Sequence, residues 1–238
     1  MTAETQPATP PDWFTQQVRL SGHTHPSQPA SLARDWWHAL TGGPPDKVTE
    51  EPRMGNVELY GTHEHGPLTL YIDSVGRLDI THPFEKGNKA SLPAFASALP
   101  LFMSLMSRWL DQDSAPGFRR LGFSGLLIKH CPRIEDCRRE LDHYLPSVDM
   151  QATQTTGFMY QVNHVCPARA IDGLMINRIV RWEIWESQMP SGEAVFAVHL
   201  ALDINTAPEH TGGLDHSAEL FAEMANYAGH FAQGGDRP

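Results

Sequence analysis

The segment EAVFAVHLALDIN (193–205) alternates apolar with small or polar side chains over its whole length. Successive side chains of a β-strand point to opposite faces of the sheet. One face therefore carries an unbroken apolar row, formed by Phe196, Val198, Leu200, Leu202 and Ile204. The opposite face carries Val195, Ala197, His199, Ala201, Asp203 and Asn205. This pattern predicts a strand in an antiparallel sheet that has one buried face and one open face.

The segment DHSAELFAEMANYAGHFA (215–232) is the expected cover for the apolar row. It has a helical stripe of apolar side chains at Leu220, Met224, Tyr227 and Phe231. We expect this closing helix to pack on the apolar row, which would turn His199 and Asp203 outward.

The remaining periodic segments repeat one order of elements, β-α-β-β-β-α. In the first half, predicted strands are 12–20, 56–63, 68–73 and 77–84, with helices at 31–40 and 92–110. In the second half, predicted strands are 118–131, 158–166, 174–187 and 193–205, with helices at 134–145 and 215–232. Residues 41–52 read as a loop, because they are rich in Gly, Pro and charge.

These elements predict an α+β protein with tandem halves at 12–112 and 113–232, between flexible tails at 1–11 and 233–238. The repeat is one of topology, without residue identity between the halves. Each half is expected to form a mostly antiparallel sheet with its helices on one face. Joined side by side, the sheets would form a pseudo-twofold saddle of about eight strands. A single irregular α+β domain and a helix-grip-like fold are the alternatives.

Composition narrows the classes of function. The 238 residues carry 18 Lys and Arg against 28 Asp and Glu, a formal net charge of -10, which disfavours nucleic acid as a partner. The most apolar stretch, 92–110, is amphipathic and contains Pro100, so no membrane span is expected.

Location is predicted from cysteine use and from the N-terminal sequence. Three cysteines without a CxxC pair indicate a reducing cytoplasm and neither a disulfide framework nor a structural zinc site. The N-terminal sequence MTAETQPATPPDW has no basic or apolar region of the kind found in signal peptides.

The strand LMINRIVRWEIWES (174–187) divides into two faces in the same way. Val180, Trp182 and Ile184 belong with the buried row, so the intervening side chains belong on the open face. The two long strands together predict one binding set on that face: Asn177, Arg181, Glu183, Trp185, His199 and Asp203.

We expect this face to bind a protein partner or a small ligand, with Trp185 as the aromatic anchor. Small side chains at Ala197 and Ala201 would leave room for it. The alternative is a solvated face whose charges form a cross-strand ion pair contributing only about 0–1 kcal/mol.

The strand at 158–166 could add side chains to the same face, and its register decides which. The candidates are either Gln161 and Asn163 or Tyr160 and His164.

The sequence also allows two kinds of enzymatic site, a metal site and an acid–base pair. His63 and His65 form a His-x-His pair that could hold a metal ion with His82 or Asp73, although an exposed edge strand also explains them. Glu183 and His199 could form an acid–base dyad if the strands pair in the required register.

Nucleotide-binding and acyl-transfer motifs are absent from the sequence. The sequence therefore predicts no particular cofactor, and it does not predict an oligomeric state.

Three passages resemble a sporadically distributed family of uncharacterised prokaryotic proteins of similar length. They are LTLYIDSVGRLDITHPF, FRRLGFSGLLIKHCP, and VFAVHLALDINT with the following DHSAELFAEMANYA. The resemblance spans 56–231 and implies the same order of elements and a prokaryotic source. It assigns no reaction or catalytic residue, and patchy distribution implies an accessory or defence-associated role.

From these observations we expect a non-enzymatic cytoplasmic binding or interaction protein that uses the open sheet face. The alternative is a metal-dependent or acid–base enzyme that uses His63 and His65, or Glu183 and His199.

Overall fold

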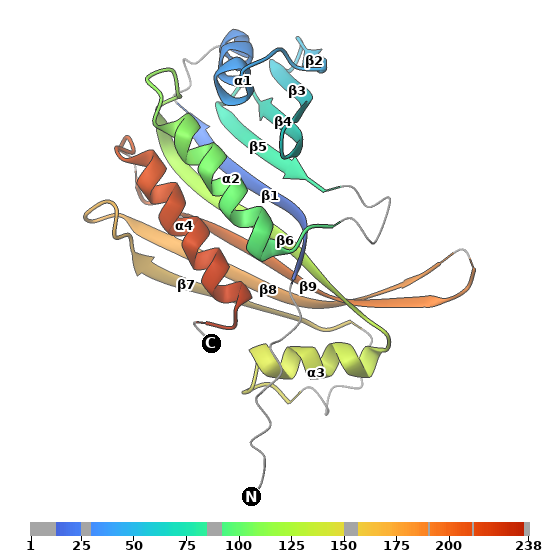
Figure 1. Ribbon diagram of the computed structural model, residues 1–238. Coiled ribbons are helices and arrows are strands. Elements are labelled where there is room, and N and C mark those ends of the chain that lie inside the picture. The colour runs from blue at the N-terminus through green and yellow to red at the C-terminus, as the bar shows by residue number, and fades with distance from the viewer. Residues whose placement is uncertain are drawn as a thin grey trace, which may run out of the picture.

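The structure, a computed structural model, describes residues 13–24, 30–84, 92–149, 157–189, 191–210 and 212–235. The predicted tail 1–11 and residues 236–238 of the second tail lie outside these ranges. The described chain forms one antiparallel sheet of nine strands, in the order β2-β3-β4-β5-β1-β6-β9-β8-β7 (Figure 1). The strands are β1 (Phe14–Thr24), β2 (Lys47–Glu51), β3 (Asn56–His63), β4 (Gly66–Ile72), β5 (Arg77–Pro83), β6 (Phe118–Cys131), β7 (Met159–Pro167), β8 (Met175–Gln188) and β9 (Ala194–Thr206).

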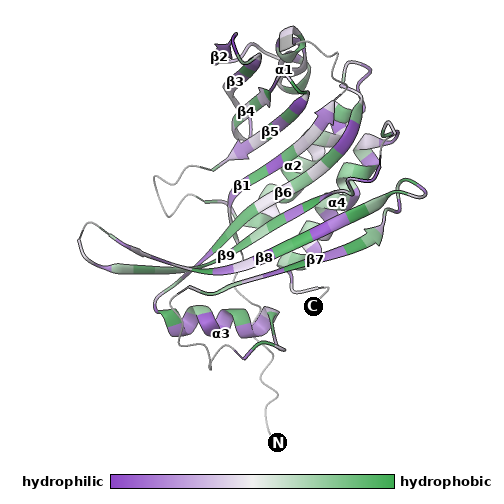
Figure 2. Cartoon of the chain, turned by 180° about the vertical axis from the view of Figure 1, so that it is seen from behind, coloured by the Kyte–Doolittle hydropathy of each residue, from purple (hydrophilic) through white to green (hydrophobic). Residues whose placement is uncertain are grey.

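The helices cover one face of this sheet. They are the short 3-10 helix η1 (Ala30–Leu32), α1 (Ala33–Thr41), α2 (Phe95–Leu110), α3 (Ile134–Tyr144) and α4 (Ser217–Ala232). Helices α2 and α4 pack side by side over the central strands, and α1 packs on β3 and β4 (Figure 1). Figure 2 shows the molecule from behind. The sheet lies in front of α2 and α4, and its other face points toward the viewer.

The expected burial of the apolar row on β9 is confirmed from Val198 to Ile204, whereas Phe196 is only partly buried. Val198, Leu200 and Ile204 are fully buried and Leu202 is 1% exposed. Helix α4 packs on β6 and β9 and buries its own Leu220, Met224 and Phe231 against the strands. Helix α3 packs on the same strands toward the Phe196 end, so two helices together roof the row.

The α+β class, the antiparallel strands and the placement of helices on one face are confirmed. β1 and β6 lie beside each other at the centre and pair antiparallel; β5, β4, β3 and β2 continue outward from β1, and β9, β8 and β7 continue outward from β6. The nine strands form one continuous open sheet over one hydrophobic core. The division into tandem halves stays a prediction.

The expectation of a loop over 41–52 was wrong in part. Lys47–Glu51 forms β2, which pairs antiparallel with β3. Its composition, KVTEE, hides the strand, because its polar side chains give no buried row. An edge strand tolerates such residues, since main-chain hydrogen bonds to one neighbour hold it and charges discourage further pairing. Several other predicted boundaries shift: β1 continues to Thr24, α2 begins at Phe95, and α4 begins at Ser217, after His216 in a left-handed conformation.

A buried ion pair fastens α3 to the sheet. Lys129, on the roofed face of β6, donates from Nζ to Glu140 Oε1 of α3 and, at 3.0 Å, to the Tyr144 hydroxyl. Trp13 Nε1 also donates to the Tyr144 hydroxyl, at 3.1 Å, and the ammonium lies 4.8 Å from the centre of the Trp13 ring. The Lys129 side chain is only 5% exposed, so these partners offset the cost of removing its ammonium group from water.

In the parts of the chain that the structure describes, no helix combines the length and the apolar character that a membrane crossing requires.

Replacing Glu140 by Gln should destabilise the fold strongly, because it leaves the Lys129 ammonium buried without its counter-charge. We expect a loss of about 3–5 kcal/mol in the free energy of unfolding, measured with urea. The matched control is Glu50→Gln, which breaks the surface pair between Arg34 and Glu50, whose side chains are 57% and 50% exposed. That loss should stay within about 1 kcal/mol. Equal losses for the two variants would contradict the role given to Lys129.

Candidate functional site on the open face of the sheet

The six residues of the predicted binding set share the face that the helices leave open. The register between β8 and β9 places Glu183 opposite His199, Arg181 opposite Ala201, and Trp185 opposite Ala197. Further along the same two strands, Ile179 lies opposite Asp203 and Asn177 opposite Asn205. Side-chain alternation puts all of these on the side away from α4, the face seen in Figure 2.

Trp185 and His199 stack on each other across the two strands. Their ring centres are 5.7 Å apart and their planes are 16° from parallel. Trp185 is nevertheless 40% exposed, whereas Ala197 directly opposite it is fully buried. The sheet therefore holds the indole in one orientation with much of its surface in water, an arrangement typical of an anchor for a partner.

From this pair of stacked rings, a row of neighbouring side chains continues across the centre of the sheet. Ile128 of β6 lies opposite His199 and is 3% exposed, and Phe14 of β1 lies opposite Ile128 and is 40% exposed. We call Trp185, His199, Ile128 and Phe14 the cross-strand strip. Ile128 and Phe14 could not be predicted from the sequence, because only the pairing of four strands brings them into line with Trp185.

The other polar residues of the predicted set lie on one side of the strip. Asn205 donates to Asp203 Oδ1 at 3.0 Å, and Asn177 donates to Asn205 Oδ1 at 3.4 Å, so one polar group is tied together at one end of β8 and β9. Arg181 and Glu183 lie between this group and Trp185. One flank of the strip thus offers both a cation and an anion.

The register of β7 settles the choice that the sequence left open. Gln161 lies opposite Arg181 and Asn163 opposite Ile179, so both join the open face. Tyr160 lies opposite Trp182 and His164 opposite Arg178, on the side of the helices.

The acid–base dyad has the register it needs, since Glu183 and His199 are directly opposed. The His199 ring, however, is packed flat against Trp185 on an open sheet. The two cavities described for this chain, the groove below and a smaller one beside Met175 and His210, have other linings. The geometry therefore favours contact with a surface over chemistry in an enclosed site.

His63 and His65 lie close together near the hairpin between β3 and β4, with ring centres 5.5 Å apart. His82, one suggested third ligand, is hydrogen-bonded through Nε2 to the carbonyl of His65 at 2.8 Å and stacks on Phe84. Asp73, the other, accepts two main-chain N–H groups in the next turn. Among the described residues, no three His, Cys, Asp or Glu side chains are arranged to hold a metal ion.

β3 has β2 and β4 as neighbours, but β2 pairs only with residues 56–60, so His63 has β4 alone beside it and His65 lies in the turn. Burial lowers the pKa of His63 and of His82 below the usual value for histidine.

The lowered pKa of His82 should make stability depend on pH. The unfolded chain takes up a proton at this site near pH 6.5 and the folded chain resists it, so this stabilisation is complete above about pH 6.5 and is lost as the pH falls through the folded pKa. We expect the free energy of unfolding to fall between pH 7.5 and pH 5, and to fall less in His82→Gln, which can still donate to His65. Identical pH dependence in the two proteins, measured by urea unfolding, would contradict this assignment.

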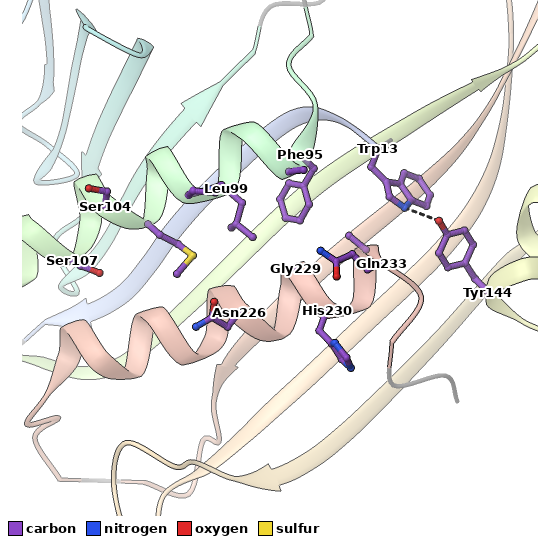
Figure 3. A pocket seen from close by; sticks show the side chains of 14 residues that line it. Trp13, Phe95, Leu99, Ser104, Ser107, Tyr144, Asn226, Gly229, His230 and Gln233 are labelled. Atoms are coloured by element: carbon purple, nitrogen blue, oxygen red, sulfur yellow. Dashed lines mark hydrogen bonds between the residues drawn. The ribbon is translucent and has the colours of Figure 1, made fainter. Parts of the chain in front are cut away.

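A second feature lies on the helix side of the sheet. A groove of about 840 Å³ runs between α2 and α4. In Figure 3, Phe95 and Leu99 lie along its middle with Asn226 across from Leu99, and Ser104 and Ser107 lie at one end. The other end is closed by Trp13, Tyr144, His230 and Gln233, with the hydrogen bond from Trp13 to Tyr144 drawn as a dashed line.

This groove could not be predicted from the sequence, because it depends on the distance between two helices that are far apart in the chain. Its middle is lined mainly by apolar side chains, with Asn226 beside them, and more polar groups lie at the two ends, an arrangement that suits an elongated ligand.

Comparison with known proteins adds no assignment: no family model matches the chain, and a search of curated proteins finds no match.

Proposed function

We propose that this protein is a non-enzymatic binding protein whose open sheet face takes up the surface of a protein partner. The observation that carries the proposal is the exposed indole of Trp185, held flat on His199 within the cross-strand strip. Trp is among the residues most enriched at the centres of binding energy in protein interfaces, and a side chain that is already packed loses little freedom when the partner binds.

The form of the face favours a protein over a small molecule. The strip lies on an extended sheet between exposed side chains and ends at the half-exposed rings of Trp185 and Phe14. A partner can cover such a surface with an apolar patch of its own, whereas a small ligand needs a concave site that removes most of its surface from water. Arg181 and Glu183 beside the strip suit a partner that carries both signs of charge.

The net charge of -10 supports a protein partner over nucleic acid. A cytoplasmic location and an accessory or defence-associated role belong to the same proposal. They rest on the sparse cysteines and on the resemblance of 56–231 to a prokaryotic family.

Replacing Trp185 by Ala should remove the partner while leaving the fold intact, because the indole is half in water and lies outside the core. Tagged wild-type and variant proteins are compared in quantitative pull-downs from the source cells. We expect a partner held by the wild type to be lost, with binding weakened by about 2 kcal/mol or more, roughly thirtyfold.

The matched control is Tyr60→Ala, which truncates another aromatic side chain of the same face that is 37% exposed but lies on β3. It should retain the partner. A set of captured proteins that is the same for wild type, Trp185→Ala and Tyr60→Ala would remove the open face as the binding surface.

We infer a second candidate function from the groove between α2 and α4, which is binding of an elongated apolar molecule with a polar end group. The supporting observation is the order of its lining, with the Tyr144 hydroxyl at one end and serines at the other. Phe95 and Ser107 on α2 are about 18 Å apart along the helix axis, a length that accommodates an extended alkyl chain.

A naturally fluorescent long-chain fatty acid, cis-parinaric acid, tests the groove directly. Met103→Trp should fill the middle of the groove and weaken binding of this probe at least tenfold, about 1.4 kcal/mol. Leu101→Trp is the control, because Leu101 lies on the same helix, is 46% exposed and does not line the groove. Equal titrations of the wild type and of Met103→Trp, or no uptake of the probe by the wild type, would contradict this candidate.

A further inference from the structure

The two edges of the sheet are built differently. At one edge, β2 is five residues long and carries Lys47, Glu50 and Glu51, all exposed. Short, charged edge strands resist pairing with another chain. At the other edge, β7 has nine residues, MYQVNHVCP, without a Lys, Arg, Asp or Glu. Apart from Pro167 at its end, this edge lacks the charges and the short length that usually prevent a further strand from being added.

The main chain of β7 offers a regular row of hydrogen-bonding groups along its free side. Ile184 donates to the carbonyl of Phe158, and Ala168 donates to the carbonyl of Leu174, so the even-numbered residues bond to β8. In an antiparallel ladder the intervening residues point their N–H and C=O groups the other way. The groups of Met159, Gln161, Asn163 and Val165 therefore face outward, where none of the described strands pairs with them.

Side chains at this edge are also incompletely covered. Met159 is 62% exposed and Val165 is 56% exposed on the open face. On the helix side, Tyr160 and Cys166 pack against the core but remain half-buried. The hydrophobic core thus extends as far as β7, the last strand on this side of the sheet, and covers its side chains only on the helix side.

We propose that β7 pairs antiparallel with β7 of a second copy of this chain, across a twofold axis at Val162. In this register, Met159 lies opposite Val165 of the second copy, and Gln161 opposite Asn163. Apolar residues then meet apolar residues and amides meet amides on the open face. On the helix side, Val162 meets itself and Tyr160 meets His164 of the second copy.

This register also satisfies the main chain. The outward-facing residues from Met159 to Val165 oppose one another, so each outward N–H finds a carbonyl. Moving the axis to Asn163 would instead set Gln161 against Val165 and Met159 against Pro167, which has no N–H. The chemistry of the strand therefore selects both the partner, a second copy, and the position of the axis.

The dimer would join the two open faces into one surface, with a cross-strand strip in each copy. The proposal of a dimer rests on β7 alone and is independent of the proposed partner of the open face.

The first test is the mass of the full chain in solution, by size-exclusion chromatography with light scattering. We expect the wild type to have twice the chain mass of 26.5 kDa. Asn163→Pro removes one outward N–H without removing a bond to β8, and proline is tolerated in edge strands, so this variant should fold and run at the chain mass. Asn163→Ala keeps the N–H and should remain a dimer. A monomeric wild type, or a dimeric Asn163→Pro, overturns the proposal.

The second test determines the register in which the two copies of β7 pair. It does not depend on the folding of the proline variant. Val162→Cys is made in a chain with Cys166 replaced by Ser. Facing residues at the axis form a pair without main-chain hydrogen bonds, whose Cα atoms lie about 4.5 Å apart, within reach of a disulfide. A mild oxidant should link the copies covalently through position 162, whereas His164→Cys in the same background should not be linked. Failure of Val162→Cys to cross-link, or equal linking at both positions, overturns the proposed pairing.

Discussion

The whole structure depends on burying one face of a long antiparallel sheet. The chain accomplishes this with α2 and α4 laid side by side over the central strands and with α3 beyond them. Each apolar side chain of the β9 row contributes about 1.5–3 kcal/mol to stability when it is removed from water. The row provides this stabilisation only when helices cover it. Where α3 completes the roof, Lys129 is buried as well, so an ion pair and an aromatic contact replace apolar packing.

Function is expected where this constraint leaves side chains uncommitted. A strand that buries every second side chain presents the others to the outside in a fixed order and at fixed spacing. On β8 and β9 these others include a stacked indole flanked by a cation and an anion, supported by rigid strands. The same arrangement leaves two further surfaces, the groove between the helices and the uncharged edge at β7.

Periodicity within single segments could be read from the sequence. It predicted the order of the elements other than β2, the roofed row from Val198 to Ile204 and the side on which His199 lies. Features that depend on how strands or helices meet could not be read. Glu183 faces His199, and Phe14 is aligned with Trp185, because of registers set by non-local pairing. β2 escaped notice because a charged edge strand has no buried row, and the groove because it depends on the packing of distant helices.

Thiol labelling of two neighbouring positions on β9 tests most directly whether the sheet has one roofed and one open face. Leu202 is 1% exposed and Asp203 is exposed. Each is replaced by Cys in a chain without its native cysteines, and the rate of reaction with a soluble maleimide is measured under native conditions. The thiol at 203 should react as fast as in the unfolded chain, and the thiol at 202 only when the protein unfolds. Rapid labelling at 202, or protection at 203, would contradict the assignment of the two faces.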